Sequence, residues 1–246
     1  MMNKMAIIIG SPGGYRNLSH RRSVAVDLDN YYSFLRSNAG GQWNEDEIQI
    51  LRDPDSNSIK ETINKVNSDY CFVAFSGHGL TNSFTEADFI CLKDKDLSIK
   101  YLVSKSERQT IIIDSRREFE SNLLKGDANI LMEESELQIK DNSTHNIFND
   151  TVLRTPKGII LVYSSQPNEI SGDDPNLGGH FTYSLIQAGF NWWNDKSNQG
   201  ILKLDSAIDS AEIILKNKFK TTQKPLMGGQ VRRLTFPPFA CSKNEK

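Results

Sequence analysis

The chain has 246 residues, which is enough for one large domain with a sizeable core. Its formal net charge of −2 favours neither a nucleic-acid partner nor an anionic membrane, and no apolar stretch reaches the ~18 residues that cross a bilayer. Its three cysteines lack C-x-x-C spacing, so we expect no disulfide framework, no zinc site and a reducing, cytoplasmic compartment.

Short apolar runs alternate with longer amphipathic segments along the chain, which is typical of a mainly parallel α/β sheet. Runs such as AIIIG, CFVAF and TIIID are apolar without alternation, which indicates strands covered on both faces. The first run has no cleavage site and is interpreted as a strand rather than as a signal peptide. The expected elements are, in chain order, strand Ala6–Gly10, helix Ser23–Ser37, strand Glu47–Leu51, helix Ser58–Val66, strands Tyr70–Ser76, Thr110–Asp114 and Gly158–Ser164, helices Phe181–Ala188 and Ser206–Phe219, and strand Gln230–Phe236.

One polar, acidic segment, from residue 119 to about residue 149, departs from this order because its periodicity is weak. Compact domains rarely contain connections of this length. We therefore predict a single domain, residues 1–246, that contains an exposed and poorly packed inserted loop at about 119–149.

Polar residues follow two successive buried strands. His78 lies between two glycines, just past the carboxyl end of its strand, where open α/β sheets bind their ligands. The next strand ends in Asp114, Ser115 and Arg116. Because adjacent parallel strands lie ~4.8 Å apart, we expect His78 and Arg116 at the same edge of the sheet, with Cβ atoms within ~10 Å. A histidine base on one strand end and a nucleophile on the next would form a catalytic dyad.

These two strand ends carry a specific resemblance. FSGHG (residues 75–79) resembles the histidine motif of caspases and metacaspases, and IIIDSRRE (residues 111–118) resembles their cysteine motif. Residues 23–48 are similar to the first-helix segment of bacterial members. Residues 158–174 and 178–185 resemble the fifth strand, the binding loop and the following helix, and residues 230–239 resemble the last strand. The resemblance implies a caspase-like three-layer α/β sandwich, with helices on both faces of a six-stranded, mostly parallel sheet, and no metal or cofactor.

The same resemblance makes His78 the catalytic histidine and puts Arg116 at the position of the nucleophilic cysteine. Arginine has no nucleophile and keeps its proton in proteins, so the usual acyl-enzyme cannot form. The chain as written is therefore either a natural pseudoprotease or an inactivated variant. Ser115 is a weaker candidate nucleophile, because it lacks a glycine-flanked elbow and alternates in direction with Arg116.

The resemblance also assigns a substrate pocket. In metacaspases, a first-helix aspartate and the aspartate two residues before the cysteine select arginine or lysine, and the matching residues are Asp27 and Asp114. Ser76 and Ser164, within the matching motifs, are assigned to substrate binding as well. Paired carboxylates suit a guanidinium through charge-assisted hydrogen bonds. The expected partner is a peptide or protein with basic residues.

Two rival functions remain open at this point. The same cleft could serve a non-catalytic module that binds a peptide or a partner domain. A nucleotide-binding doubly wound protein is less favoured, because the loop at residues 10–14 has neither a P-loop ending nor a dinucleotide fingerprint.

Overall fold

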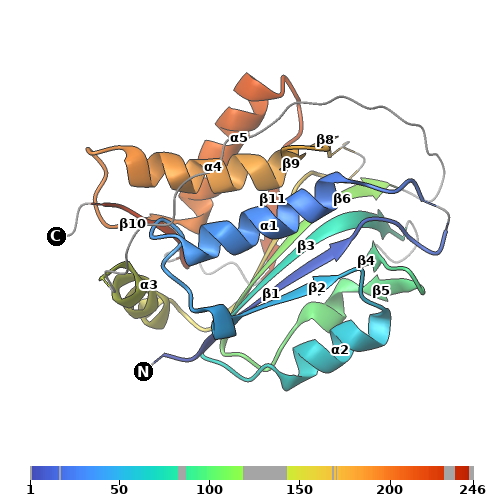
Figure 1. Ribbon diagram of the computed structural model, residues 1–246, viewed down its shortest axis with the longest axis horizontal. Coiled ribbons are helices and arrows are strands. Elements are labelled where there is room, and N and C mark those ends of the chain that lie inside the picture. Colours follow the sequence, from blue (N-terminus) through green and yellow to red (C-terminus); the bar gives the residue numbers. More distant parts are fainter. Residues whose placement is uncertain are drawn as a thin grey trace.

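A twisted sheet forms the centre of the protein (Figure 1). The computed structural model describes residues 2–16, 18–82, 87–118, 143–167, 169, 171–229 and 236–243, with the backbone alone at 116–118 and 229. The main path of the sheet runs in the order β11-β7-β6-β3-β1-β2, and all of its neighbours are parallel except β11 and β7. The strands are β1 (Lys4–Ser11), β2 (Ile48–Arg52), β3 (Tyr70–Thr81), β6 (Arg108–Glu118), β7 (Gly158–Tyr163) and β11 (Leu226–Gly229). This confirms the predicted mostly parallel sheet, but in the described residues the sheet has eight strands rather than six, because two short strands, Asp88–Cys91 and Asp96–Ser98, join it beside β3.

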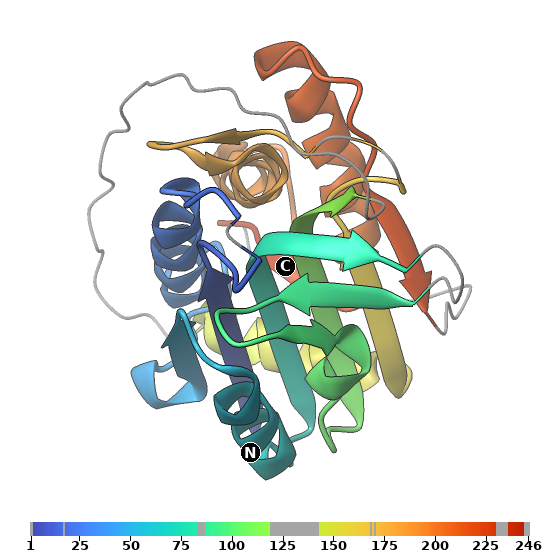
Figure 2. The ribbon, with the colours of Figure 1, turned by 90° about the vertical axis from the view of Figure 1, so that its right-hand side faces the viewer.

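Helices cover both faces of the sheet (Figures 1 and 2). One face packs against α1, α3, α4 and α5, and the other packs against α2. A short branch, β4 and β5, pairs with β3. The remaining elements are α1 (Ser23–Arg36), α2 (Ser56–Lys65), β4 (Asp88–Cys91), β5 (Asp96–Ser98), α3 (Ser143–Arg154), β8 (Asp173–Asp174), β9 (Gly178–Gly179), α4 (His180–Asn194), β10 (Ile201–Lys203), α5 (Leu204–Lys218), β12 (Pro238–Cys241) and the 3-10 helices Glu45–Glu47 and Ile99–Leu102.

Side chains along the central strands point alternately to the two faces of the sheet, which divides the interior into two cores. In β3, Phe72 and Ala74 face the core beneath α1 and α4, whereas Val73 and Phe75 face the core beneath α2. Successive side chains of a strand point to opposite faces. The side chain of Ser76, the next even-numbered residue, therefore emerges on the α1 side of the sheet.

The predicted inserted loop extends too far toward the C-terminus. Residues 119–142 lie outside the described part of the chain, but residues 143–149 form the first half of α3 rather than a loop. Phe148 is buried and packs edge-on against Trp43, with ring centroids 5.8 Å apart. Asn149 accepts a hydrogen bond of 2.8 Å from the buried ammonium of Lys4. The polar composition of residues 143–149 predicted an exposed loop, but their polar side chains form hydrogen bonds to partners elsewhere in the fold, which allows this face to be buried.

The last predicted strand, Gln230–Phe236, lies outside the described residues except for Phe236, which is not in a strand. The strand at that edge of the sheet, β11, comes slightly earlier. In the described part of the chain, no helix has the length and apolar character that a membrane span requires.

Candidate active site

The site lies where β3 and β6 extend beyond their neighbours in the sheet. Their pairing continues past the last β6–β7 pair, Ile113 with Tyr163, and aligns Ser76 with Asp114 and His78 with Arg116. The predicted placement of the two motif residues at one sheet edge is therefore confirmed. The backbone of Arg116 belongs to β6, and its side chain lies outside the described part of the structure.

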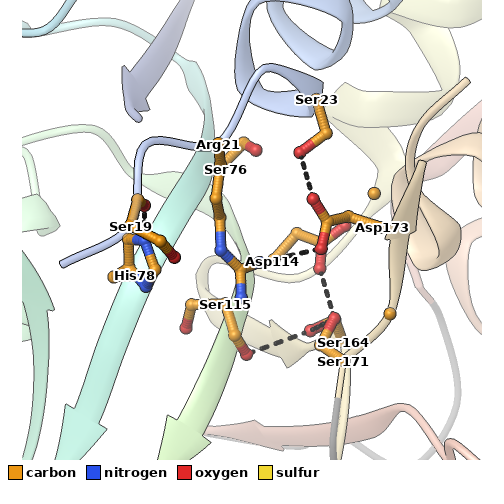
Figure 3. A network of polar contacts seen from close by, with 12 residues as sticks. Ser19, Arg21, Ser23, Ser76, His78, Asp114, Ser115, Ser164, Ser171 and Asp173 are labelled. Atoms are coloured by element: carbon orange, nitrogen blue, oxygen red, sulfur yellow. Dashed lines mark hydrogen bonds and ion pairs between the residues drawn. The ribbon is translucent and has the colours of Figure 1, made fainter. Parts of the chain in front are cut away.

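His78 contacts the loop that follows β1. Its Nε2 lies 2.9 Å from the carbonyl oxygen of Ser19 (Figure 3). Because a carbonyl oxygen can only accept a hydrogen bond, Nε2 carries the proton in this contact. His78 is buried, with 5% of the residue's surface exposed. In this tautomer Nδ1 carries the lone pair that can accept a proton from another group.

The two aspartates assigned to the substrate pocket are close together and buried. Asp27, on α1, accepts hydrogen bonds from Ser76 Oγ at 2.5 Å and from the Gly179 amide at 2.8 Å. Asp114 accepts three hydrogen bonds, from Ser171 Oγ at 3.0 Å and from the amide and hydroxyl of Thr182 at 3.0 and 2.7 Å. These carboxylates tie α1 and α4 to the sheet, so protein groups already engage them.

Glycines in the β8–β9 hairpin allow this close approach. A β-carbon on Gly179 would overlap the Asp114 carboxylate, and one on Gly178 would overlap the carboxylate of Asp27. Gly178 also has a φ of +94°, a backbone conformation that L side chains rarely adopt. Position 178 therefore requires glycine for both its backbone angle and its contact.

The proton affinity of Asp27 is strongly altered. Burial, followed by the negative charge of Asp114, raises the pKa of Asp27 well above its ordinary value of 3.8. The folded protein therefore holds a proton on Asp27 at pH values where the unfolded chain has released it. It follows that this carboxyl group makes folding less stable as pH rises from about 4 toward the folded-state pKa.

Replacing Asp27 with asparagine is expected to remove that pH dependence, because the amide has the shape of the protonated acid. We expect Asp27→Asn to gain stability relative to the parent as pH rises, so that its free energy of unfolding minus that of the parent is larger at about pH 7.5 than at about pH 4.5. Denaturant unfolding at both pH values measures this difference.

The control is Asp55→Asn at the exposed N-cap of α2. The hydrogen bond from the Ser58 amide lowers the pKa of Asp55 below 3.8. The contribution of the ionised Asp55 carboxylate to folding stability is therefore lost only at more acidic pH. This variant should leave the change between the two pH values as it is in the parent. Equal pH dependence in the parent and Asp27→Asn would show that Asp27 titrates normally.

Ser164 belongs to the same polar network. Its hydroxyl lies 3.2 Å from Ser171 Oγ, which in turn bonds Asp114. Gln223 donates to the Ser164 carbonyl at 2.7 Å and to Ser171 Oγ at 3.2 Å. The structure thus brings Asp27, Ser76, Asp114 and Ser164 together. Their roles toward a substrate stay predictions.

Two charged residues that the sequence analysis did not single out complete the network. Arg21, two residues before α1, forms an ion pair with Asp173, its Nη1 lying 3.5 Å from Oδ1. Asp173 Oδ2 accepts a hydrogen bond of 2.7 Å from Ser23 Oγ. Figure 3 shows the Arg21 side chain extending across the site toward Asp173. In the sequence, these residues belong only to a basic stretch and to a turn, so no local pattern marks them.

Ser115 is poorly placed to act as a nucleophile beside His78. It shares the strand face of Ile111 and Ile113, which pack in the core beneath α2, opposite to Asp114. Its hydroxyl lies where a β-carbon on Gly79 would be, and 3% of its surface is exposed. Within the described ranges, no group of three or more His, Cys, Asp or Glu residues could hold a metal ion.

Comparisons with known proteins bear on the family and the fold. A sequence model of the caspase domain matches residues 3–230. The chain belongs to the caspase domain family. Among solved structures, this caspase domain is similar to caspase-1 from Spodoptera frugiperda, with a TM-score of 0.61 and 15% identity over 92% of this chain and 88% of that chain. At that identity, the structural likeness supports the fold alone. No curated protein matches the chain.

Proposed function

We propose that this caspase domain binds peptides through a basic side chain and does not cleave them, because Arg116 stands where the family has its nucleophile. The observation that carries the proposal is the strand register, which pairs His78 with Arg116 at the site edge. Arginine offers no nucleophile for the imidazole to activate.

Acidic side chains around this edge support the preference for basic peptides. Asp114 and Asp173 belong to the network beside His78, and an acidic ligand would meet like charge there, whereas Asp27, whose raised pKa favours its neutral form, adds little charge. A guanidinium or ammonium group would meet opposite charge in a site that excludes much of the water.

Two of the chain's three thiols are poor candidates to replace the nucleophile. Burial raises the pKa of Cys71 and of Cys241 to about 12, which keeps both thiols protonated near neutral pH. Cys91 is buried on β4 and follows Ile90, whose strand position pairs with Gly79, the residue after His78. It is therefore the thiol that an activity test must control for.

The first test is hydrolysis of fluorogenic peptides that end in Arg, Lys or Asp. We expect the parent chain to release no fluorophore above the buffer rate from any of them. Cys91→Ser and His78→Ala should behave identically to the parent. Hydrolysis by the parent that either variant abolishes would contradict the proposal and would identify a working nucleophile or base.

A further inference from the structure

His78 belongs to a hairpin at the end of β3. Residues 79–81 pair with β4 in antiparallel register, so that Thr81 lies opposite Asp88. Figure 2 shows this end of β3 turning across the sheet, with β4 running back beside it. We call residues 77–81 together with β4 the His78 hairpin. Because the hairpin extends beyond the last pair between β6 and β7, the position of His78 depends on the contacts that hold its far end.

A carboxylate at that far end joins the hairpin to β7. One oxygen of Asp88 accepts a hydrogen bond of 2.6 Å from Thr81 Oγ1, and the other accepts one of 2.5 Å from the Tyr163 hydroxyl. Tyr163 is the last residue of β7, and β6 lies between β7 and β3 in the sheet. The bond therefore spans the strand between them. Short hydrogen bonds to an ionised carboxylate are about twice as strong as neutral ones, so this contact is well suited to fix the hairpin.

The contact between Tyr163 and Asp88 lies on the opposite face of the sheet from the buried acidic network. Tyr163 is 6% exposed and packs in the core beneath α2, where Phe75 and Ile113 also lie. Asp27 and Asp114 bond instead to groups of β9, α4 and their neighbours on the α1 side. A change at Tyr163 can therefore alter the position of His78 without removing a polar group from that network.

The hairpin also lies close against β6, the strand that carries position 116. A β-carbon on Gly79, the residue after His78, would overlap the Ser115 hydroxyl of β6. The register pairs His78 itself with Arg116. Fixing the hairpin against β6 thus fixes the distance between the imidazole and the side chain at position 116.

We propose that Tyr163 and Asp88 are positioning residues for His78. Their hydrogen bond holds the hairpin in the place where Nε2 of His78 donates to the Ser19 carbonyl. The two residues act through His78 rather than on a ligand. The inference rests on the proposed function only in taking this cleft as the working site.

Proton exchange in the parent chain tests this positioning directly. Tyr163→Phe removes one oxygen and keeps the ring in its core. The Nε2 proton of His78, identified by its loss from the NMR spectrum of His78→Ala, should be protected in the parent because it is buried and hydrogen-bonded. We expect it to exchange with solvent about tenfold faster in Tyr163→Phe, since the loss of a hydrogen bond to a carboxylate lets the hairpin open more often.

Tyr70→Phe is the matched control. Tyr70 is also a buried tyrosine, and its hydroxyl donates to Thr110 Oγ1 at 2.9 Å. It is the first residue of β3, at the other end of the strand from His78. Tyr70→Phe should lower the denaturant midpoint, as Tyr163→Phe does, but should leave the exchange rate of the His78 proton as it is in the parent.

The same variants in an Arg116→Cys background separate positioning from binding. We expect Tyr163→Phe to lower kcat for a peptide ending in arginine by about ten- to a hundredfold and to leave KM unchanged, because only the geometry of the reacting groups is altered. Tyr70→Phe should change neither constant. Asp88→Asn should lower kcat as well, and adding it to Tyr163→Phe should cost little more, because both substitutions break the same bond.

Two results would overturn the inference. One is a His78 proton that exchanges at the parent rate in Tyr163→Phe. The other is an equal loss of kcat in Tyr163→Phe and Tyr70→Phe, which would trace the effect to stability alone. If Tyr163→Phe does not fold, Asp88→Asn takes its place in the exchange measurement, with the same expected result and the same contrary one.

A binding assay on the parent keeps the proposed function separate from this inference. Fluorescence anisotropy compares labelled peptides that end in arginine or in citrulline, which has nearly the shape of arginine without its charge. If the parent does not prefer arginine, the basic-peptide function fails, and the exchange rate of the His78 proton still decides whether Tyr163 positions the imidazole. If the parent prefers arginine but that rate is the same in Tyr163→Phe, the positioning role alone fails.

Discussion

Arg116→Cys is expected to turn the chain into a thiol-dependent peptidase that cuts after arginine or lysine. The substitution sets a thiol at the strand position paired with His78. An imidazolium beside a thiol lowers the pKa of the thiol well below its free value of about 8.5 and favours the attacking thiolate. The measurement is release of a fluorophore from peptides ending in Arg, Lys or Asp.

The controls separate the role of the base from that of the pocket. Adding His78→Ala should lower kcat by about 10²- to 10⁴-fold, the usual contribution of a positioned base. An Arg116→Cys enzyme that prefers aspartate would disprove the basic pocket. One that stays inert at every pH, while binding basic peptides, would show that the cleft serves binding alone.

The second large effect is on stability. Gly178→Ala is expected to lower the free energy of unfolding by about 3 kcal/mol. An alanine at φ +94° costs about 1–2 kcal/mol, and its β-carbon would overlap the carboxylate of Asp27, which is 1% exposed and cannot move outward. Chemical denaturation measures the loss.

Gly200→Ala is the matched control for that substitution. Gly200 has a φ of +70°, and a β-carbon there would have no atom within 4 Å. Gly200→Ala should therefore lower the free energy of unfolding by the backbone cost alone, about 1–2 kcal/mol. Equal losses at the two positions would mean that the hairpin relaxes away from Asp27, and that the close approach of Gly178 to that carboxylate is not required.

Much of the site's position follows from local sequence pattern. The apolar, non-alternating runs before FSGHG and IIIDSRRE predict buried parallel strands, and strands of that kind end at a common edge. That reasoning sufficed to place His78 beside Arg116, and the register confirms it. The family motifs likewise grouped Ser76 with the two aspartates, because each motif carries its residues at defined spacings.

The tertiary structure alone decided which carboxylate is accessible. Asp27 and Asp114 are satisfied by donors from β9, α4 and the segment before β8, and Arg21 reaches Asp173 across 152 positions of the chain. The same holds for α3, whose polar sequence conceals a face buried against Trp43. Periodicity reports contacts within one element, whereas these contacts depend on how separate elements pack.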